Sequence, residues 1–106
     1  MDRQPDITLR TLPLPGNTLT NVRLVHAGHY GDGSPAFEVY DDEGMYCRVT
    51  VALPDAVPAE GCIFVKDYSE NAGMVNALLS AGAIATTGRV FDAGFVRRGV
   101  VEARFL

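Results

Sequence analysis

Residues 62–82 read CIFVKDYSENAGMVNALLSAG, a continuous apolar run that gives way to a polar segment and then to apolar residues at helical spacing. The apolar residues that would share one face of a helix are Ala72, Val75, Leu78 and Leu79. The apolar run at 62–65 is short, as in a strand buried on both faces. The stretch therefore predicts a buried strand followed by one amphipathic helix near 69–81.

The ends of this helix carry recognisable signals. Ser69 is a candidate N-cap, and Glu70 suits the positive end of the helix dipole. Gly82 is a typical C-terminal stop. Gly73 falls inside the predicted helix, where glycine costs about 1 kcal/mol relative to alanine. We interpret Gly73 as a point of close backbone packing.

The residues before the helix favour antiparallel strands. Residues 19–27 are rich in β-formers, and Gly31-Asp32-Gly33 supplies a turn into a return strand at 36–40. The acidic turn Asp41-Asp42-Glu43-Gly44 then leads into residues 45–53, where apolar residues alternate with others. This order predicts a meander of three strands.

Shorter strand signals follow the helix at 84–91, 93–96 and 100–106. Strands, one helix and strands again do not form the alternating units of a parallel sheet. The predicted fold class is therefore α+β, with a curved antiparallel sheet of about five to six strands covered by one amphipathic helix near 69–81.

A chain of 106 residues fits one domain. Residues 1–17 contain Pro5, Pro13 and Pro15 with weak periodicity, so we expect an extended arm there, with an edge strand around 7–12 as an alternative. Residues 18–106 form the single predicted α+β domain.

The composition and net charge of the chain limit the functions that it can have. Hydrophobic residues make up 47% of the chain and the formal net charge is −4, so the overall field repels phosphate backbones. Arg97-Arg98 is the adjacent basic pair and is typical of a solvated loop. The sequence therefore predicts no direct contact with nucleic acid.

Cys47 and Cys62 are the two cysteines, and each falls in a strand-like run, which indicates buried free thiols. The N-terminus shows no signal-peptide pattern and no apolar run reaches the length of a membrane span. We expect a cytoplasmic protein with no membrane contact.

Catalytic and metal signals are weak. His26 and His29 lie three residues apart, yet their surroundings predict a strand end and a glycine turn, not a helix face. A nucleophile with a base and an orienting partner is not evident. We expect no cofactor, no metal and no catalytic residues.

The most distinctive polar segment is Lys66–Asn71, at the junction of strand and helix. Its alternative interpretation is structural, with Asp67 or Ser69 capping the helix, Tyr68 packing over its start and Lys66 pairing with Glu70. Candidate binding residues from this segment and from the acidic turn are Asp41, Asp42, Glu43, Lys66, Asp67, Tyr68, Glu70 and Asn71.

Four motifs carry a family resemblance: KDYSENAGM at 66–74, LLSAG at 78–82, TGR at 87–89 and AGFV at 93–96. The chain resembles a family of small uncharacterised proteins of bacteria, phages and mobile elements, a domain of unknown function. The similarity covers roughly residues 18–106 and implies context, not chemistry. Small acidic proteins of mobile elements are often stoichiometric antagonists of host defence, anti-CRISPR proteins among them.

The leading hypothesis is a non-enzymatic protein-binding module that inhibits a host-defence, CRISPR-type nuclease complex, with Asp41, Asp42, Glu43 and Glu70 facing a basic groove. The partner is then a host protein complex, and the chain itself a monomer or homodimer. One alternative is a small metal-dependent enzyme using His26, His29, Asp67 and Tyr68. Another is an assembly protein that oligomerises through a strand edge.

Overall fold

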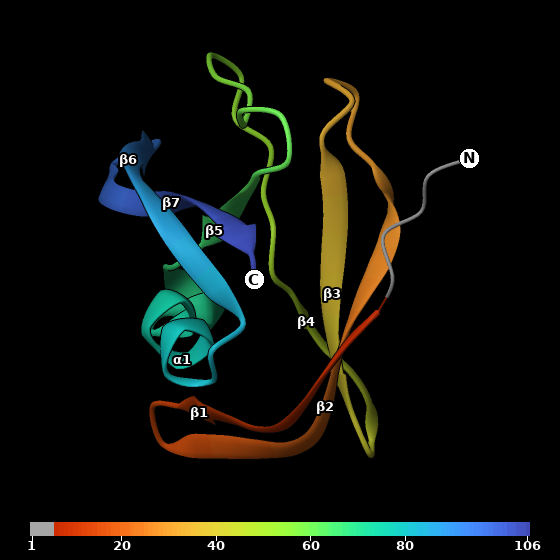
Figure 1. The fold of residues 1–106 in the computed structure, drawn as a ribbon. Coiled ribbons are helices and arrows are strands. Elements are labelled where there is room, and N and C mark those ends of the chain that lie inside the picture. The colour runs from red at the N-terminus through yellow and green to blue at the C-terminus, as the bar shows by residue number, and fades with distance from the viewer. Residues whose placement is uncertain (1–5) are drawn as a thin grey trace.

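The structure is a computed structural model that describes residues 6–106, and it has seven strands, one α-helix and one short 3-10 helix (Figure 1). The elements in chain order are β1 (Ile7–Leu14), β2 (Asn17–His29), β3 (Pro35–Asp41), β4 (Gly44–Arg48), β5 (Ile63–Lys66), η1 (Ser69–Asn71), α1 (Met74–Ser80), β6 (Ile84–Ala93) and β7 (Val96–Phe105). The α+β class with antiparallel strands and one helix is confirmed.

The strands form two sheets, not the single sheet that the sequence predicted. One sheet has the order β1-β2-β3-β4 and the other the order β5-β7-β6, with every pairing antiparallel. Residues 49–51 connect the sheets, because Val49 donates its N–H to Phe37 while its carbonyl accepts the N–H of Lys66. The expected third strand at 45–53 is thus β4 followed by this connecting segment.

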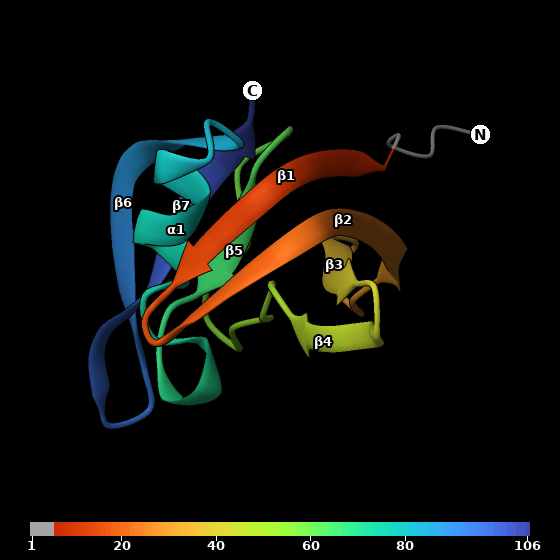
Figure 2. The same cartoon turned by 90° about the horizontal axis from the view of Figure 1, so that it is seen from below.

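The long strand β2 shapes the first sheet. Its first part pairs with β1 and its last part with β3, and a bulge interrupts the register between His26 and His29. Gly28 lies within the bulge at a φ of 110°, a conformation that suits glycine. At the other end of β2, the β1–β2 hairpin bends away from β3 and passes beneath α1 (Figure 1); Figure 2 shows the hairpin from below.

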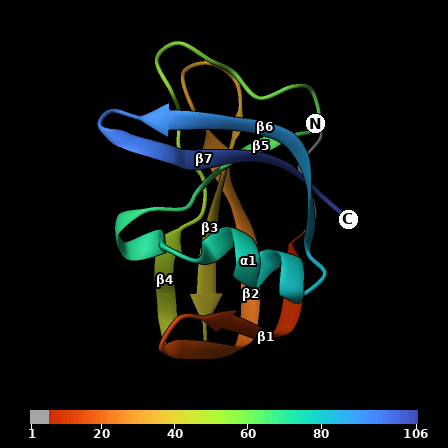
Figure 3. The same ribbon diagram turned by 90° about the vertical axis from the view of Figure 1, so that its left-hand side faces the viewer.

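The core lies between the two sheets, with α1 on one side. Helix α1 contacts β1, β5 and β6, and Figure 3 shows it between the β1–β2 hairpin and the three-stranded sheet. The fully buried side chains of this core come from both sheets and the helix, and include Leu12, Leu24, Phe37, Val39, Val49, Val65, Met74, Leu78 and Ala103. One apolar cluster therefore joins all the layers.

Residues 7–14 correct the expected arm. They form β1, and Leu12 and Leu14 are buried in the core. The alternation of exposed and buried residues from Thr11 to Leu14 is the half-buried strand pattern. These residues therefore belong to the folded domain, while the rest of the expected arm, residues 1–5, lies outside the described residues.

The helix lies where the sequence placed it but is interrupted at its start. Residues 69–71 form η1, and α1 begins only after Gly73, which has a φ of 89°. A Cβ on Gly73 would lie 2.5 Å from Cγ of Pro15, in the β1–β2 turn. The expected close packing at Gly73 is confirmed, and it fixes where the β1–β2 hairpin meets the helix.

A buried carboxylate ties the 52–61 loop to the second sheet. Glu102 is 1% exposed and accepts hydrogen bonds from the Ala59 N–H (2.9 Å) and the Thr87 hydroxyl (2.6 Å), and it pairs with Arg89 at 2.8 Å. Burial opposes ionisation of Glu102, but these partners outweigh it and lower its pKa. The loop thereby covers the face of the sheet turned away from α1.

Candidate functional site

The segment Lys66–Asn71 carries an exposed ion pair. Lys66 Nζ lies 2.7 Å from a Glu70 carboxylate oxygen and 5.1 Å from the centre of the Tyr68 ring. The hydrogen bond from Lys66 lowers the pKa of Glu70 to about 2, so Glu70 is ionised at neutral pH but already paired. The expected Lys66–Glu70 pair is confirmed.

The other polar residues of this segment have structural contacts. Asp67 accepts the N–H of Val75 at 3.0 Å in the first turn of α1, so Asp67 provides the capping oxygen, whereas Ser69, the other predicted cap, lies in η1 and does not cap α1. Asn71 is fully buried and donates to the carbonyl of Arg48 at 2.7 Å. Tyr68 packs against β7, where a Cβ on Gly99 would lie 2.9 Å from its ring. These contacts fasten β4, η1 and β7 together.

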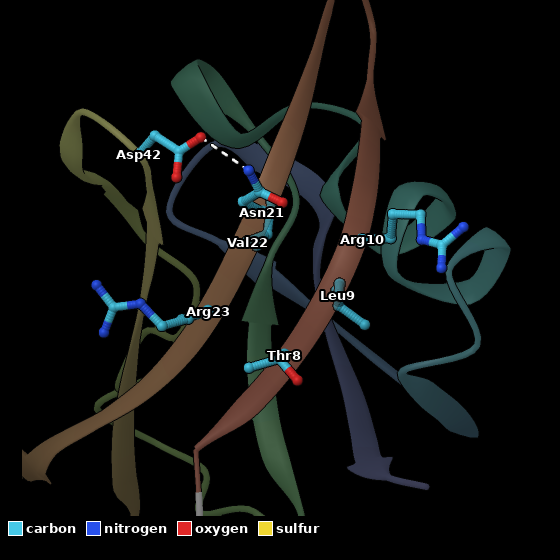
Figure 4. Close-up of a pocket in the computed structure, with 7 residues that line it drawn as sticks. All are labelled: Thr8, Leu9, Arg10, Asn21, Val22, Arg23 and Asp42. Atoms are coloured by element: carbon cyan, nitrogen blue, oxygen red, sulfur yellow. Dashed lines mark hydrogen bonds between the residues drawn. The ribbon is translucent and has the colours of Figure 1, made fainter.

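The acidic turn lies between β3 and β4. Asp41 accepts the N–H of Glu43 at 2.8 Å, which closes the turn. Asp42 accepts the side-chain amide of Asn21 at 2.9 Å, and Asn21 has a φ of 53° within β2 (Figure 4). Glu43 is exposed, so the turn presents negative charge to solvent at one end of the sheet.

A hollow of about 480 Å³ adjoins this turn, between β1 and β2. Arg10 and Arg23 both line it, but Figure 4 shows their guanidinium groups pointing to opposite sides. The two cations therefore do not converge on one anion. The hollow is therefore a concave surface beside the acidic turn.

A chain of contacts that the sequence did not predict crosses the outer face of β2, β3 and β4. The Arg23 guanidinium lies 5.3 Å from the Tyr40 ring centre, and the Tyr40 hydroxyl donates to Glu38 at 3.1 Å. Glu38 pairs with Arg48 at 3.0 Å, and Arg48 lies 5.9 Å from the Tyr30 ring centre. We call this set, Arg23, Tyr40, Glu38, Arg48 and Tyr30, the outer-face ladder.

The strand register builds the outer-face ladder. Arg23 pairs with Tyr40 and Glu38 with Arg48 across adjacent strands, while their sequence neighbours Leu24, Val39 and Cys47 face the core. Cross-strand partners lie within side-chain reach of one another. Polar residues at alternate positions of three strands were a visible signal, but their partnership depends on a register that the sequence does not specify.

The electrostatics of the outer-face ladder are coupled. The hydrogen bond to Glu38 raises the pKa of Tyr40, and the same carboxylate raises the pKa of Arg48. The Glu38 side chain is only 14% exposed whereas that of Arg48 is 49% exposed. The ladder therefore presents arginine and tyrosine edges to solvent, with the carboxylate held beneath them.

The acidic turn and the segment Lys66–Asn71, which contain the predicted binding residues, lie at opposite ends of β4. The acidic turn precedes Gly44, and Asn71 is bonded to Arg48 at the last residue of the strand. The outer-face ladder lies between these two ends of β4. Arg48 belongs to the ladder and also accepts the hydrogen bond from Asn71. The structure thus links the expected acidic turn to the ladder directly, and the segment Lys66–Asn71 through one buried hydrogen bond.

The surroundings of the histidines and cysteines do not favour reactivity. His26 and His29 meet edge to face at 4.9 Å between ring centres, and His26 also packs on Phe37. Within residues 6–106, no cluster of three or more His, Cys, Asp or Glu side chains is arranged to hold a metal. Both cysteines are free, and burial raises the pKa of Cys47 to about 11, which leaves little thiolate at neutral pH.

Comparisons of the chain with protein-family models, curated proteins and solved structures found no match. Among the residues that the structure describes, no helix is long and apolar enough to cross a membrane.

Proposed function

We propose that this protein is a non-enzymatic protein-binding module whose contact surface is the outer-face ladder together with the acidic turn. The observation that carries the proposal is the connected row of arginine and tyrosine side chains on one face of the first sheet. Tyrosine and arginine are enriched among the residues that dominate binding energy at protein interfaces. The ladder concentrates both types on a surface that packing does not otherwise use.

The outer-face ladder is also preorganised. Each member contacts the next at hydrogen-bonding or cation–π distance. Side chains that are already ordered lose less rotamer entropy on binding, where each immobilised side chain costs about 0.5–1.5 kcal/mol. The ladder can therefore meet a partner with little reorganisation.

The acidic turn adds charge beside the outer-face ladder. Asp42 and Glu43 are exposed, and Asp41 directly follows Tyr40. A partner with a basic groove would be attracted to this end of the surface, which accelerates association. Glu70, the fourth acidic residue expected to face the groove, is paired with Lys66 and contributes less.

The catalytic alternative has less support. It relied on His26, His29, Asp67 and Tyr68, but Asp67 holds the helix start and Tyr68 packs on Gly99. The thiol of Cys47 is protonated at neutral pH. These contacts give Asp67 and Tyr68 structural roles, so we retain the binding module as the better account.

The partner class to test first follows from the family resemblance: a host-defence nuclease complex, inhibited by stoichiometric binding. Wild-type protein and two double variants serve as bait in host lysate, followed by nuclease assays and phage plaque assays. Arg23→Ala/Arg48→Ala disrupts the ladder. Arg10→Ala/Arg104→Ala is the matched control, because it removes the same charge from exposed arginines outside the ladder.

Wild type and control are expected to recover the same defence protein, inhibit its nuclease and protect phage, while the ladder variant loses all three effects. Circular dichroism and thermal unfolding verify that each variant is folded. Recovery of a different class of protein would retain the binding module and reject the nuclease inhibitor. Equal capture by the ladder and control variants would reject the ladder as the binding surface.

A further inference from the structure

The turn between β6 and β7 exposes an aromatic ring far from the outer-face ladder. Phe95 is fully exposed, at 106% of its reference area, and Val96 beside it is 39% exposed. Figure 3 shows this hairpin end projecting from the body of the molecule. Arg97 and Arg98 follow, and their guanidinium groups have no hydrogen bond or ion pair with any residue of the described chain. We call residues 95–98 the hairpin tip.

A hollow of about 450 Å³ lies at the base of the hairpin tip. Its apolar walls come from the 52–61 loop and from β6, and they include Leu53, Pro54, Ala56 and Phe91. Phe91 is held in place by Phe64, with 4.9 Å between ring centres. Asp55 and Asp92 also line the hollow, and one carboxylate oxygen of Asp92 accepts the backbone N–H of Arg98 in the same hairpin at 2.9 Å.

The hairpin tip and the hollow are complementary in size and charge. A cavity of about 150 Å³ is enough to hold a benzene ring, so the hollow has room for a phenylalanine ring and neighbouring atoms. Two unpaired arginines accompany the ring, and two aspartates accompany the hollow. An aromatic anchor in an apolar pocket, with opposite charges around it, is the pattern of an interface hot spot.

The hairpin tip does not fill the hollow of its own chain. Gly94 is part of the lining, yet the next residue, Phe95, is fully exposed. Because one chain carries both complementary parts side by side, a second copy related by a two-fold axis can exchange them reciprocally. We infer that two copies of this chain associate by placing each Phe95 ring in the Leu53–Phe91 hollow of the other copy.

This dimer is expected to be weak and concentration-dependent. The contact is centred on one aromatic ring per copy, which is small compared with the roughly 800 Å² that each partner buries in a stable interface. The net charge of −4 also disfavours association except where local charges are paired. Self-association by the hairpin tip leaves the outer-face ladder free for a different protein.

Sedimentation velocity of the full chain from micromolar to millimolar concentration tests the inference. Phe95→Ala removes the anchor, and Leu79→Ala is the matched control because Leu79 is another exposed apolar residue, 41% exposed on α1. We expect wild type and the Leu79 variant to dimerise alike, and the Phe95 variant to dimerise at least tenfold more weakly. A wild type that stays monomeric throughout, or equal dimerisation by the Phe95 variant, overturns the inference.

A charge exchange gives an independent test. Arg97→Asp/Arg98→Asp makes the hairpin tip acidic, so this variant repels its own copies, whereas Asp55→Arg leaves the hollow without net charge beside Asp92 and removes the attraction. In a mixed pair, the basic tip of the Asp55 variant meets the acidic hollow of the other variant, and the acidic tip meets the hollow without net charge. We expect each variant alone to lose at least tenfold in association and the mixture to associate more tightly than either variant, as a heterodimer. A mixture that stays as dissociated as its components overturns the inference.

Discussion

The carboxylate of Asp67 accepts a hydrogen bond from the backbone N–H of Val75 over 3.0 Å, across the whole of η1 and Gly73. The first N–H groups of a helix have no partner within the helix. The residue directly before α1, Gly73, has no side chain to supply one, so the capping oxygen comes from Asp67, directly after β5. This bond ties the strand to the helix that covers it.

Asp67→Ala is therefore expected to lower the free energy of unfolding by about 1 kcal/mol, the usual cost of losing an N-cap acceptor. Asp67→Asn keeps an acceptor oxygen and is expected to lose less. Ser80→Ala, at the exposed end of α1, serves as the control. Denaturant unfolding measures all three, and an Asp67→Ala variant as stable as wild type would show that Val75 finds another partner.

Gly73→Ala is expected to be more damaging than Gly82→Ala. Both glycines have positive φ, at 89° and 72°, so both variants carry the left-handed strain of about 1–2 kcal/mol. Only at Gly73 does the new Cβ also meet Pro15, which adds about 1–3 kcal/mol for overpacking. Chemical denaturation gives the difference, and equal losses at the two sites would contradict the close contact.

A second substitution refines this comparison. Pro15→Ala removes the ring atoms nearest Gly73, so the combined variant is expected to lose less stability than the two separate losses together. Strict additivity would show that Pro15 and Gly73 do not contact each other in solution.

These two contacts show how far sequence reasoning extends. The apolar spacing of Ala72, Val75, Leu78 and Leu79 predicted the helix because helical spacing is local. Val75 and Leu78 are buried as expected, whereas Ala72 and Leu79 are exposed. The break before Met74, where Gly73 has a φ of 89°, was not predicted. The contact of Gly73 with Pro15 joins residues remote in sequence and exists only in the folded chain. Strand β1 was left open for a similar reason, since its prolines obscured an alternation that pairing with β2 makes regular.

In the candidate site, too, features set by local sequence were predicted, and features set by contacts between remote residues were not. The acidic turn was predicted correctly as a turn, because Asp41–Gly44 carries local turn chemistry. The outer-face ladder joins residues from β2, β3 and β4, and Arg23 and Arg48 become neighbours of tyrosines only through strand pairing. A single sequence does not specify that register, so the ladder emerged only from the structure.

Glu102 predicts a pH-dependent stability. Its pKa is lowered in the folded protein, so its contribution is complete above the unfolded pKa of about 4.3 and is lost as the pH falls through the lower folded value. Glu102→Gln places an amide donor near the Ala59 N–H or the Thr87 hydroxyl. At neutral pH we expect this variant to be less stable than wild type by about 1–3 kcal/mol.

Denaturant unfolding at a series of pH values checks the sign of this effect. The gap between wild type and Glu102→Gln should narrow as the solution becomes acidic. Glu60→Gln, an exposed residue of the same loop, is the control and should track wild type at every pH. A gap that widens in acid would contradict the lowered pKa of Glu102.

The outer-face ladder predicts opposite shifts of one tyrosine pKa. Glu38 raises the pKa of Tyr40, and Arg23 acts in the other direction. Glu38→Gln is therefore expected to lower the pKa of Tyr40, while Arg23→Gln is expected to raise it. Titration of the Tyr40 ring by nuclear magnetic resonance reads both. Shifts in the same direction, or none, would show that the three side chains are not neighbours in solution.

The claim that the outer-face ladder and the acidic turn form a protein-binding surface is tested most directly by hydrogen–deuterium exchange. The chain is compared free and in complex with the protein it captures from host lysate. The account predicts that binding protects residues 35–48, which include β3, the acidic turn and β4, and leaves the hairpin tip at 95–98 unchanged. Protection confined to the hairpin tip, or spread over α1 with residues 35–48 unaffected, would contradict it.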